Sequence, residues 1–334
     1  MTSFIPENQP LFVLTGLIFL VIIVLLLWQY VAIRYGQSLF TQMTRYVTRT
    51  QRELEQNQRL LQFKDKYPKT YKILSQRFDV QHFYGLPLTL IGVMMACILV
   101  LFITLISVVA VPNPVVAVTV IDQFLSARIS LRPDSDSVGF FVLITSFAST
   151  PIYVLVVLLA ALSCWVRQQC YIIVGLLIAT LSSTTVTYLL KHVLERERPD
   201  NSLLAVQTFS FPSGHATTAM ALYGFIAYLL IRFNTNFARK IRITTIAILF
   251  ILLLGLSRVV LNLHYLSDVL GGYLVGAFWL TLGISITEWL SAKDKIVWKV
   301  EWSTSHVYII WLSGLGVFIS TLIYAKIYQL PMLS

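Results

Sequence analysis

The segment "SRVVLNLHYLSD", residues 257–268, places Arg258, His264 and Asp268 between two apolar runs. Each run, 243–262 before these side chains and 266–287 after them, is long enough to form a membrane-spanning helix. A charged side chain within the hydrocarbon costs about 2.5–3.5 kcal/mol on insertion scales. Three ionisable side chains so close together therefore indicate a functional site where two membrane helices meet.

The whole chain has the composition of an integral membrane protein. Of its 334 residues, 57% are hydrophobic and 12% are charged, and the mean hydropathy is +0.77. A soluble domain carries about a quarter charged residues. The net charge of +10 does not indicate a nucleic-acid partner, because most basic residues flank the apolar runs on one side. The three cysteines, Cys97, Cys164 and Cys170, show no pairing pattern, so we interpret them as small apolar residues.

The apolar runs predict an all-α integral membrane protein with eight spans. A span needs about 20 mostly apolar residues. The first run is longer than the core of a signal peptide, so we expect it to be a permanent span. The predicted spans are 10–33, 86–111, 143–166, 171–190, 216–231, 243–262, 266–287 and 306–327.

The basic residues predict the orientation. One side of the membrane holds 18 of the 25 Lys and Arg residues. They lie in the segment 34–84, at residue 167, and in the loops 232–242 and 288–305. The positive-inside rule makes that side cytoplasmic and puts both termini outside.

The segment 37–84 is the only sizeable polar piece. Four apolar residues recur in it at intervals of seven: Phe40, Val47, Leu54 and Leu61. One interpretation is a helix that continues the first span along the membrane surface and is broken by Pro68. The alternative is a short coiled coil that mediates a homodimer. One apolar residue per heptad is weak support for it, because a coiled coil uses two.

Three polar clusters fall on the predicted outer face, the first being "KHVLERERPD", residues 191–200. Lys191 follows the fourth apolar run, and Arg198 comes seven residues later. Cations that snorkel to lipid headgroups would explain the cluster, although the positive-inside rule makes it unexpected on this face. A bound anion would also account for it.

The second cluster is "FPSGHATTAM", residues 211–220. A helix is expected to follow Gly214, and the amide groups at a helix start form a ready phosphate site. Ser213 can cap that helix and also donate its hydroxyl, and His215 then lies at the membrane surface. An ordinary helix start would look the same when read alone.

The third cluster is the segment 257–268. Asp268 can reach His264 if the seventh helix begins early enough, since four residues return to nearly the same helix face. The carboxylate would fix the imidazole tautomer and leave the second nitrogen available as a nucleophile, while Arg258 suits phosphate oxygens. Taken alone, the pair is better explained as a buried structural His–Asp contact than as a catalytic one. Together, the three clusters provide cations, a helix start and two imidazoles, which fits phosphoryl transfer.

In this order and spacing, the clusters resemble the three-part signature of the type 2 phosphatidic acid phosphatase superfamily. The resemblance extends to the phosphatase domain of bacterial proteins that carry a DedA-like domain, although this chain shows no complete DedA-like domain. The matching residues are Lys191, Arg198 and Pro199, then Pro212 to His215, then Ser257, Arg258, His264 and Asp268.

The resemblance implies a six-helix lipid phosphatase core, formed by spans two to seven, with one extra helix at each end. The expected domains are an N-terminal transmembrane helix, a cytoplasmic or interfacial helical linker, the core and a C-terminal transmembrane helix. Their ranges are 1–36, 37–84, 85–290 and 291–334.

The resemblance also implies the roles of the residues in a metal-independent mechanism without a cofactor. His264 would attack phosphorus and form a phosphohistidine, oriented by Asp268, and His215 would protonate the leaving oxygen and then activate water. Neither a DxD nor an HExxH metal motif is present in the sequence. The residues expected to bind phosphate are Lys191, Arg198, Ser213, Gly214 and Arg258.

The expected substrate is the phosphate or diphosphate head of an envelope lipid, in the first place undecaprenyl diphosphate. The alternatives are phosphatidate, phosphatidylglycerol phosphate, and transfer of the phosphate to a second lipid such as lipid A. The expected location is a bacterial inner membrane, crossed several times, with the site facing the periplasm. A non-catalytic scaffold or transporter would use the same cations as a lipid clamp, and soluble haloperoxidases that share the signature lack membrane spans.

Overall fold

The computed structural model describes residues 9–71, 86–109, 117–129, 135–200, 208–298 and 304–329, and every regular element in these ranges is helical. The predicted all-α class is therefore confirmed. The helices are α1 (Gln9–Glu55), α2 (Gln58–Lys66), α4 (Leu86–Val109), α5 (Ala117–Ile129), α6 (Ser135–Ser146), α7 (Thr150–Val166), α8 (Cys170–Leu177), α9 (Ser183–Leu194), α10 (Gly214–Thr218), α11 (Gly224–Arg232), α12 (Phe237–Val260), α13 (Leu266–Ser291) and α14 (Thr304–Gln329). Two π-helical turns, η1 (Ile178–Ser182) and η2 (Ala219–Tyr223), join α8 to α9 and α10 to α11.

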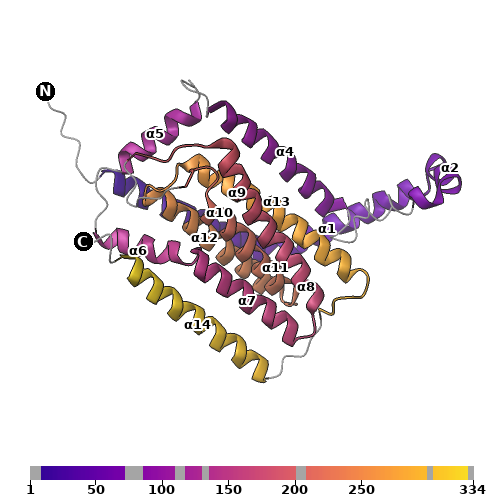
Figure 1. Cartoon of the computed structure of the whole chain (residues 1–334). Coiled ribbons are helices and arrows are strands. Elements are labelled where there is room, and N and C mark those ends of the chain that lie inside the picture. Colours follow the sequence, from indigo (N-terminus) through magenta and orange to yellow (C-terminus); the bar gives the residue numbers. More distant parts are fainter. Residues whose placement is uncertain are drawn as a thin grey trace.

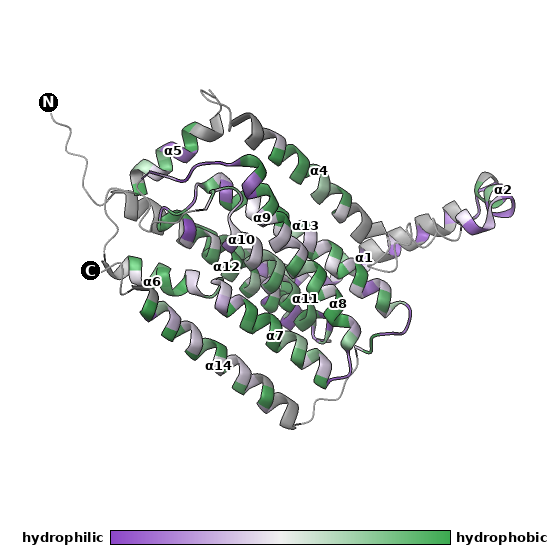
Figure 2. Ribbon diagram, viewed as in Figure 1, coloured by the Kyte–Doolittle hydropathy of each residue, from purple (hydrophilic) through white to green (hydrophobic). Residues whose placement is uncertain are grey.

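Each predicted span contains an apolar helix. Six helical segments in the described ranges are long and apolar enough to cross a membrane, and shorter apolar stretches lie in α4 and α14. Hydrophobic residues cover most of the bundle, while hydrophilic residues gather at its ends and on α2 (Figure 2). The chain is thus a multi-pass membrane protein. The six segments are Phe19–Gln42, Val138–Val166, Cys170–Leu194, Gly214–Arg232, Phe237–Val260 and Leu266–Ser291.

The third span differs from the predicted continuous helix over 143–166. It begins earlier, in α6, and is interrupted at 147–149 before α7 starts. In the interruption the amides of Phe147, Ala148 and Ser149 donate to carbonyls three residues back, and a proline occupies the first turn of α7. A proline has no N–H to donate and fits only the first turn of a helix, which explains a new start here.

Helix α13 lies at the centre of the bundle and contacts α4, α8, α10 and η1. Its glycines let neighbouring backbones approach, as is common between membrane helices. A Cβ atom at Gly272 would lie 2.5 Å from the carbonyl oxygen of Ser213, and one at Gly276 would lie 2.6 Å from that of Thr217. These contacts fix α10 against the first half of α13.

The two ends of the bundle differ in what they contain. Helix α1 begins and α14 ends at the same end, where α9 and α12 also end and α10 and α13 begin (Figure 1). We call this the site end, because the predicted site residues belong to these termini. Helix α2 lies beyond the opposite end (Figure 1).

The first helix is longer than the predicted span. Helix α1 continues without a break past residue 36, the expected domain boundary, to Glu55 and away from the bundle (Figure 1). The polar helix expected to continue until Pro68 is instead interrupted at residues 56–57, so Leu61 lies on α2. The repeat every seven residues therefore does not lie on one helix. Residues 72–84 of the expected linker lie outside the described residues.

We predict that Gly272→Ala destabilises the protein. The added methyl group would meet backbone atoms of Ser213 and Thr217, which cannot move away without displacing α10. Overpacking of this kind costs about 1–3 kcal/mol. The thermal unfolding midpoint in detergent should fall, whereas Gly316→Ala, where the methyl group meets nothing within 4 Å, should leave it unchanged or raise it. Equal midpoints for the two variants would contradict the tight packing of α10 on α13.

Candidate active site

All the predicted site residues lie in the described part of the chain, and the structure brings them together at the site end. Lys191 lies in the last turn of α9, and Arg258 lies in that of α12. Both imidazoles, of His215 and His264, interact electrostatically with the same cations. Those cations are Lys191, Arg198 and Arg258.

A turn after α12 brings His264 close to Arg258. Asn262 adopts a left-handed conformation with φ of 50°, which asparagine tolerates better than most residues. Its side-chain oxygen accepts a hydrogen bond from Ser126 of α5 at 2.9 Å. The amides of Leu263 and His264 then both donate to the carbonyl of Arg258, at 3.0 and 3.3 Å. Two site residues six positions apart are thereby held by one backbone carbonyl.

The carboxylate of Asp268 holds His264 from the other side. Helix α13 begins at Leu266, early enough for the predicted pairing, and Nδ1 of His264 lies 3.5 Å from Oδ2 of Asp268. This is slightly longer than an ordinary hydrogen bond, as is common before substrate binds. The same oxygen accepts the amide of Tyr265 at 2.9 Å and the hydroxyl of Ser210. The carboxylate is thus fixed beside the imidazole.

His264 is buried, with only 3% of its surface exposed. Burial and the positive charges of Arg258, Arg198 and Lys191 hold the pKa of His264 well below its usual range. With Nδ1 directed at Asp268, Nε2 is the nitrogen that keeps its lone pair. This nitrogen lies 3.3 Å from Nη1 of Arg198. A neutral imidazole with a fixed tautomer is the form that a nucleophile needs.

Neutral oxygens orient Lys191 and Arg198. Lys191 donates to the carbonyls of Phe209 and Ser210, the latter at 3.3 Å. Arg198 donates from Nε to the carbonyl of Thr208 at 2.6 Å and from Nη1 to that of Leu263. Carbonyl dipoles orient a cation without cancelling its full charge, so these bonds are compatible with binding an anion.

Arg258 is buried, with 4% of its surface exposed, and connects α12 to the interrupted third span. Its Nη1 donates to the hydroxyl of Thr145 at 2.9 Å, two residues before the interruption. The position of this guanidinium therefore depends on the end of α6 as well as on α12.

Ser213 differs in one respect from the prediction. It occupies the N-cap position of α10, but its side chain makes no capping hydrogen bond. Its amide instead donates to the carbonyl of Asp268 at 2.9 Å, which anchors the main chain to α13. The hydroxyl is fully buried and has no partner among the described residues, and a Cβ atom at the neighbouring Gly214 would meet nothing within 4 Å. A buried hydroxyl without a protein partner, next to open space, is available to donate to a phosphate oxygen.

A second set of ionic contacts at the site end was not predicted. Arg196 lies between two buried carboxylates, donating to Asp268 through Nη1 and to Asp122 of α5 through Nη2 at 2.8 Å. Ser267 bonds to both Arg196 and Asp122. Its hydroxyl accepts from Arg196 at 2.7 Å, and its amide and hydroxyl both donate to Asp122. Asp122 is 2% exposed. These contacts neutralise Asp268 and hold its second oxygen, so we interpret Arg196 and Asp122 as positioning residues.

One sequence signal for this network existed. Asp122 is the only charged residue in the apolar run "VVAVTVIDQFL", and a lone carboxylate in such a run requires a partner. Arg196 was hidden among the other cations of the first cluster. The path of the chain after α9 decides that Arg196, and not Arg198, contacts the carboxylates of Asp122 and Asp268. The sequence does not specify that path.

The buried His–Asp pair with cations around it defines a candidate phosphate-binding active site in a membrane helical bundle. Residues 170–292, which contain every predicted site residue, match the family model of the PAP2 superfamily. The resemblance seen in the three clusters is therefore confirmed.

Individual relatives agree with this match. The chain is 42% identical over 89 residues to phosphatidylglycerophosphatase B of Bacillus subtilis, covering 26% of this chain and 44% of that protein. It is 32% identical over 123 residues to a lipid A 1-phosphatase of Rhizobium johnstonii, covering 34% of this chain and 45% of the relative. The chain thus spans less than half the length of these two relatives.

A solved structure shares the fold. The crystal structure of a transmembrane PAP2-type phosphatidylglycerolphosphate phosphatase from Bacillus subtilis superposes with a TM-score of 0.50 at 28% identity. The superposition covers 60% of this chain and 96% of that one. Most of the remaining 40% of this chain has no counterpart there.

We predict that Asp122→Asn lowers kcat while KM changes little. The asparagine can still accept the amide of Ser267, but it removes one of the two charges that hold Arg196 in line with Asp268. Loss of an outer positioning group costs about 10–100-fold in activity. Asp294→Asn at the opposite end is the matched control and should have no effect. A rise in KM alone would place Asp122 in substrate binding instead of positioning.

Proposed function

We propose that this protein is a membrane phosphatase that hydrolyses the phosphate head of a lipid through a phosphohistidine at His264. The observation that carries the proposal is the buried, neutral His264 with Nδ1 facing Asp268 and Nε2 facing the cations. The PAP2 match and the phosphatase relatives support the same reaction.

In the first step Nε2 of His264 attacks phosphorus. The N–P bond forms while the P–O bond to the lipid breaks, and His215 gives its proton to the leaving oxygen. Asp268 accepts the Nδ1 hydrogen bond and stabilises the positive charge that develops on the ring. In the second step His215 takes a proton from water and the water oxygen attacks phosphorus. The new P–O bond forms while the N–P bond breaks, which releases inorganic phosphate and restores Nε2 of His264.

The surrounding cations stabilise the charge on the phosphoryl oxygens. Phosphoryl transfer depends mainly on positioning and electrostatic stabilisation. In a site that excludes water these charges act more strongly than in bulk solvent. We assign this role to Lys191, Arg198 and Arg258, with the hydroxyl of Ser213 and the amide of Gly214 as further donors.

A groove beside the site supports a lipid substrate. A cavity of about 300 Å³ lies among α1, α5, α12 and α13. Val259 and Leu266 line it, and they are neighbours in sequence of Arg258 and Tyr265. Nearly all its other lining residues are leucine, isoleucine or valine. We propose that the hydrocarbon tail of the substrate occupies this groove while the phosphate reaches the cations.

Phosphatidylglycerol phosphate is the first substrate to test, because the 42% identical relative and the solved structure carry the name of that activity. Undecaprenyl diphosphate, the substrate expected from the sequence, is the second. Three cations converge on the site, which suits the higher charge of a diphosphate. We propose that the site faces the outside of a bacterial inner membrane, as the distribution of basic residues indicates.

We predict phosphate release from lipid phosphates in detergent with EDTA present. The panel is phosphatidylglycerol phosphate, phosphatidate and undecaprenyl diphosphate, and a requirement for added metal would contradict the mechanism. His264→Ala should lower kcat about a thousandfold or more, since the nucleophile is lost. His192→Ala is the control, because the His192 ring only meets the rings of Tyr188 and Phe209 edge to face. Turnover only when an acceptor lipid is added would indicate a phosphotransferase.

We predict that kcat/KM stays high as the pH falls through about 6.5, the ordinary pKa of histidine. His264 must be neutral to attack, and its lowered pKa keeps it neutral until the pH falls well below that value. Arg258→Gln removes one positive charge that disfavours the imidazolium form of His264. The decrease of kcat/KM at low pH, the acid limb of the pH profile, should therefore move to higher pH. The limb would not move if it came from ionisation of the substrate. An acid limb at or above pH 6.5 in the unmodified protein would contradict a neutral His264.

A further inference from the structure

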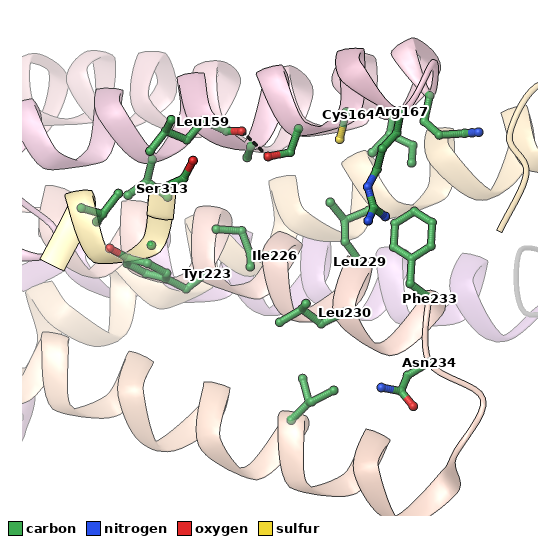
Figure 3. A pocket seen from close by; sticks show the side chains of 18 of the residues that line it. Leu159, Cys164, Arg167, Tyr223, Ile226, Leu229, Leu230, Phe233, Asn234 and Ser313 are labelled. Carbon is green, nitrogen blue, oxygen red and sulfur yellow. Dashed lines mark hydrogen bonds between the residues drawn. The ribbon is translucent and has the colours of Figure 1, made fainter. Parts of the chain in front are cut away.

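A large cavity lies away from the candidate active site, among α7, α11, α12 and α14. Its volume is about 730 Å³, within the range of sites that bind small molecules. Leu159, Ile226 and Leu230 belong to its apolar wall, and Tyr223 and Ser313 lie toward one end (Figure 3). None of the predicted catalytic or phosphate-binding residues is among the residues that line it.

Aromatic side chains close the deep end of this cavity. The rings of Tyr223 and Phe250 meet edge to face with centroids 4.8 Å apart, and Phe147 packs on Phe250 at 5.5 Å. The hydroxyl of Tyr223 also donates to the carbonyl of Phe147 at 2.6 Å. Phe147 follows Thr145, the partner of Arg258, by two residues, but neither Thr145 nor any residue of the candidate active site lines the cavity.

The other end of the cavity is polar and positively charged. Arg167, Phe233 and Asn234 gather there (Figure 3), and the guanidinium of Arg167 lies 5.5 Å from the centre of the Phe233 ring. Arg239 also lines this end, and none of the described lining residues is acidic. These residues follow α7 and flank the start of α12, at the end opposite the site. A positive polar end above an apolar wall complements an anionic amphiphile.

The length of the cavity corresponds to one leaflet. Lining residues on α12 extend from Arg239 to Phe250, eleven residues apart. At about 1.5 Å per residue this is about 16 Å, roughly half of the hydrocarbon core of a bilayer. A single acyl chain could therefore extend from the polar end to the aromatic cluster.

Helix α14 completes this cavity, although it lies outside the matched residues 170–292. Ser313, Gly314 and Val317 line one side, and a Cβ atom at Gly314 would meet nothing within 4 Å. A smaller cavity of about 50 Å³ between α7 and α14 shares Arg167 and Ser313 with it.

We propose that this cavity binds one anionic phospholipid from the leaflet opposite the active site, with the phosphate at Arg167 and Arg239 and one acyl chain along the apolar wall. The charge complementarity of the polar end selects an anionic lipid over a zwitterionic one. The proposal does not depend on the phosphatase activity, because the cavity shares no residue with the candidate active site.

The test counts bound lipid on the purified full chain by native mass spectrometry. Phosphatidylglycerol and phosphatidylcholine with the same acyl chains are titrated separately. We expect one phosphatidylglycerol to bind about tenfold more tightly than phosphatidylcholine, through charge-assisted contacts with its phosphate. Arg167→Gln should reduce this preference, whereas Arg242→Gln, an exposed position on α12 that does not line the cavity, should not.

Two glycine variants test where the lipid binds. Gly314→Phe fills the cavity and should abolish binding, while Gly316→Phe adds the same side chain on α14 outside the cavity and should retain it. Thermal unfolding checks that both variants are folded, with Gly314→Leu as the substitute if the phenylalanine is not tolerated. Lys191→Gln separates this cavity from the active site and should leave phosphatidylglycerol binding unchanged.

Three results would overturn the proposal. They are equal binding of the two lipids to the unmodified protein, binding that survives Gly314→Phe and Gly314→Leu, and loss of binding in Lys191→Gln. The last would place the lipid in the active site.

Discussion

The buried carboxylate of Asp268 is the constraint on which the site end depends. It is inaccessible to solvent, and it contacts His264, Arg196, Ser210 and the amide of Tyr265. Removing one partner of a buried ion pair costs about 3–5 kcal/mol, because the remaining charge stays desolvated. The segments after α9, before α10 and after α12 must therefore take paths that satisfy this one group. The same contacts orient the imidazole, so stability and chemistry depend on the same atoms.

Irregular backbone lies where the site needs polar groups. Within hydrocarbon each backbone amide and carbonyl must be satisfied internally, which leaves regular helices as the default. The π turn η1 directly precedes the helix that carries Lys191, and η2 follows the short helix that carries His215. The interruption at 147–149 lies next to Thr145, which holds Arg258. Such π turns are frequent at functional sites, since one extra residue re-aims the side chains that follow.

Helices outside the matched segment contribute to both polar and apolar sites. Helix α5 supplies Asp122 to the ionic network and Ser126 to the turn at Asn262. Helix α14 closes one side of the large cavity, and α1 contributes to the groove beside the active site. Residues 170–292, which match the family model, are therefore only part of the structure around the candidate site.

The sequence alone determined the membrane class, the approximate spans and the residues of the three clusters. A membrane span is a local feature of the sequence, because it consists of about 20 consecutive apolar residues. Ionisable residues such as His264 and Asp268 stand out next to such runs, because placing them in a bilayer costs free energy. The tertiary structure decided the rest. It showed the break before α7, the break before α2 and the uncapped hydroxyl of Ser213. It also showed that Arg196 pairs with the carboxylates of Asp122 and Asp268, while Arg198 lies next to the imidazole of His264. The partners of Arg196, Arg198 and the Ser213 amide lie more than 50 positions away in the sequence, as Asp122 does from Arg196, and no local pattern of side chains encodes a partner at that separation.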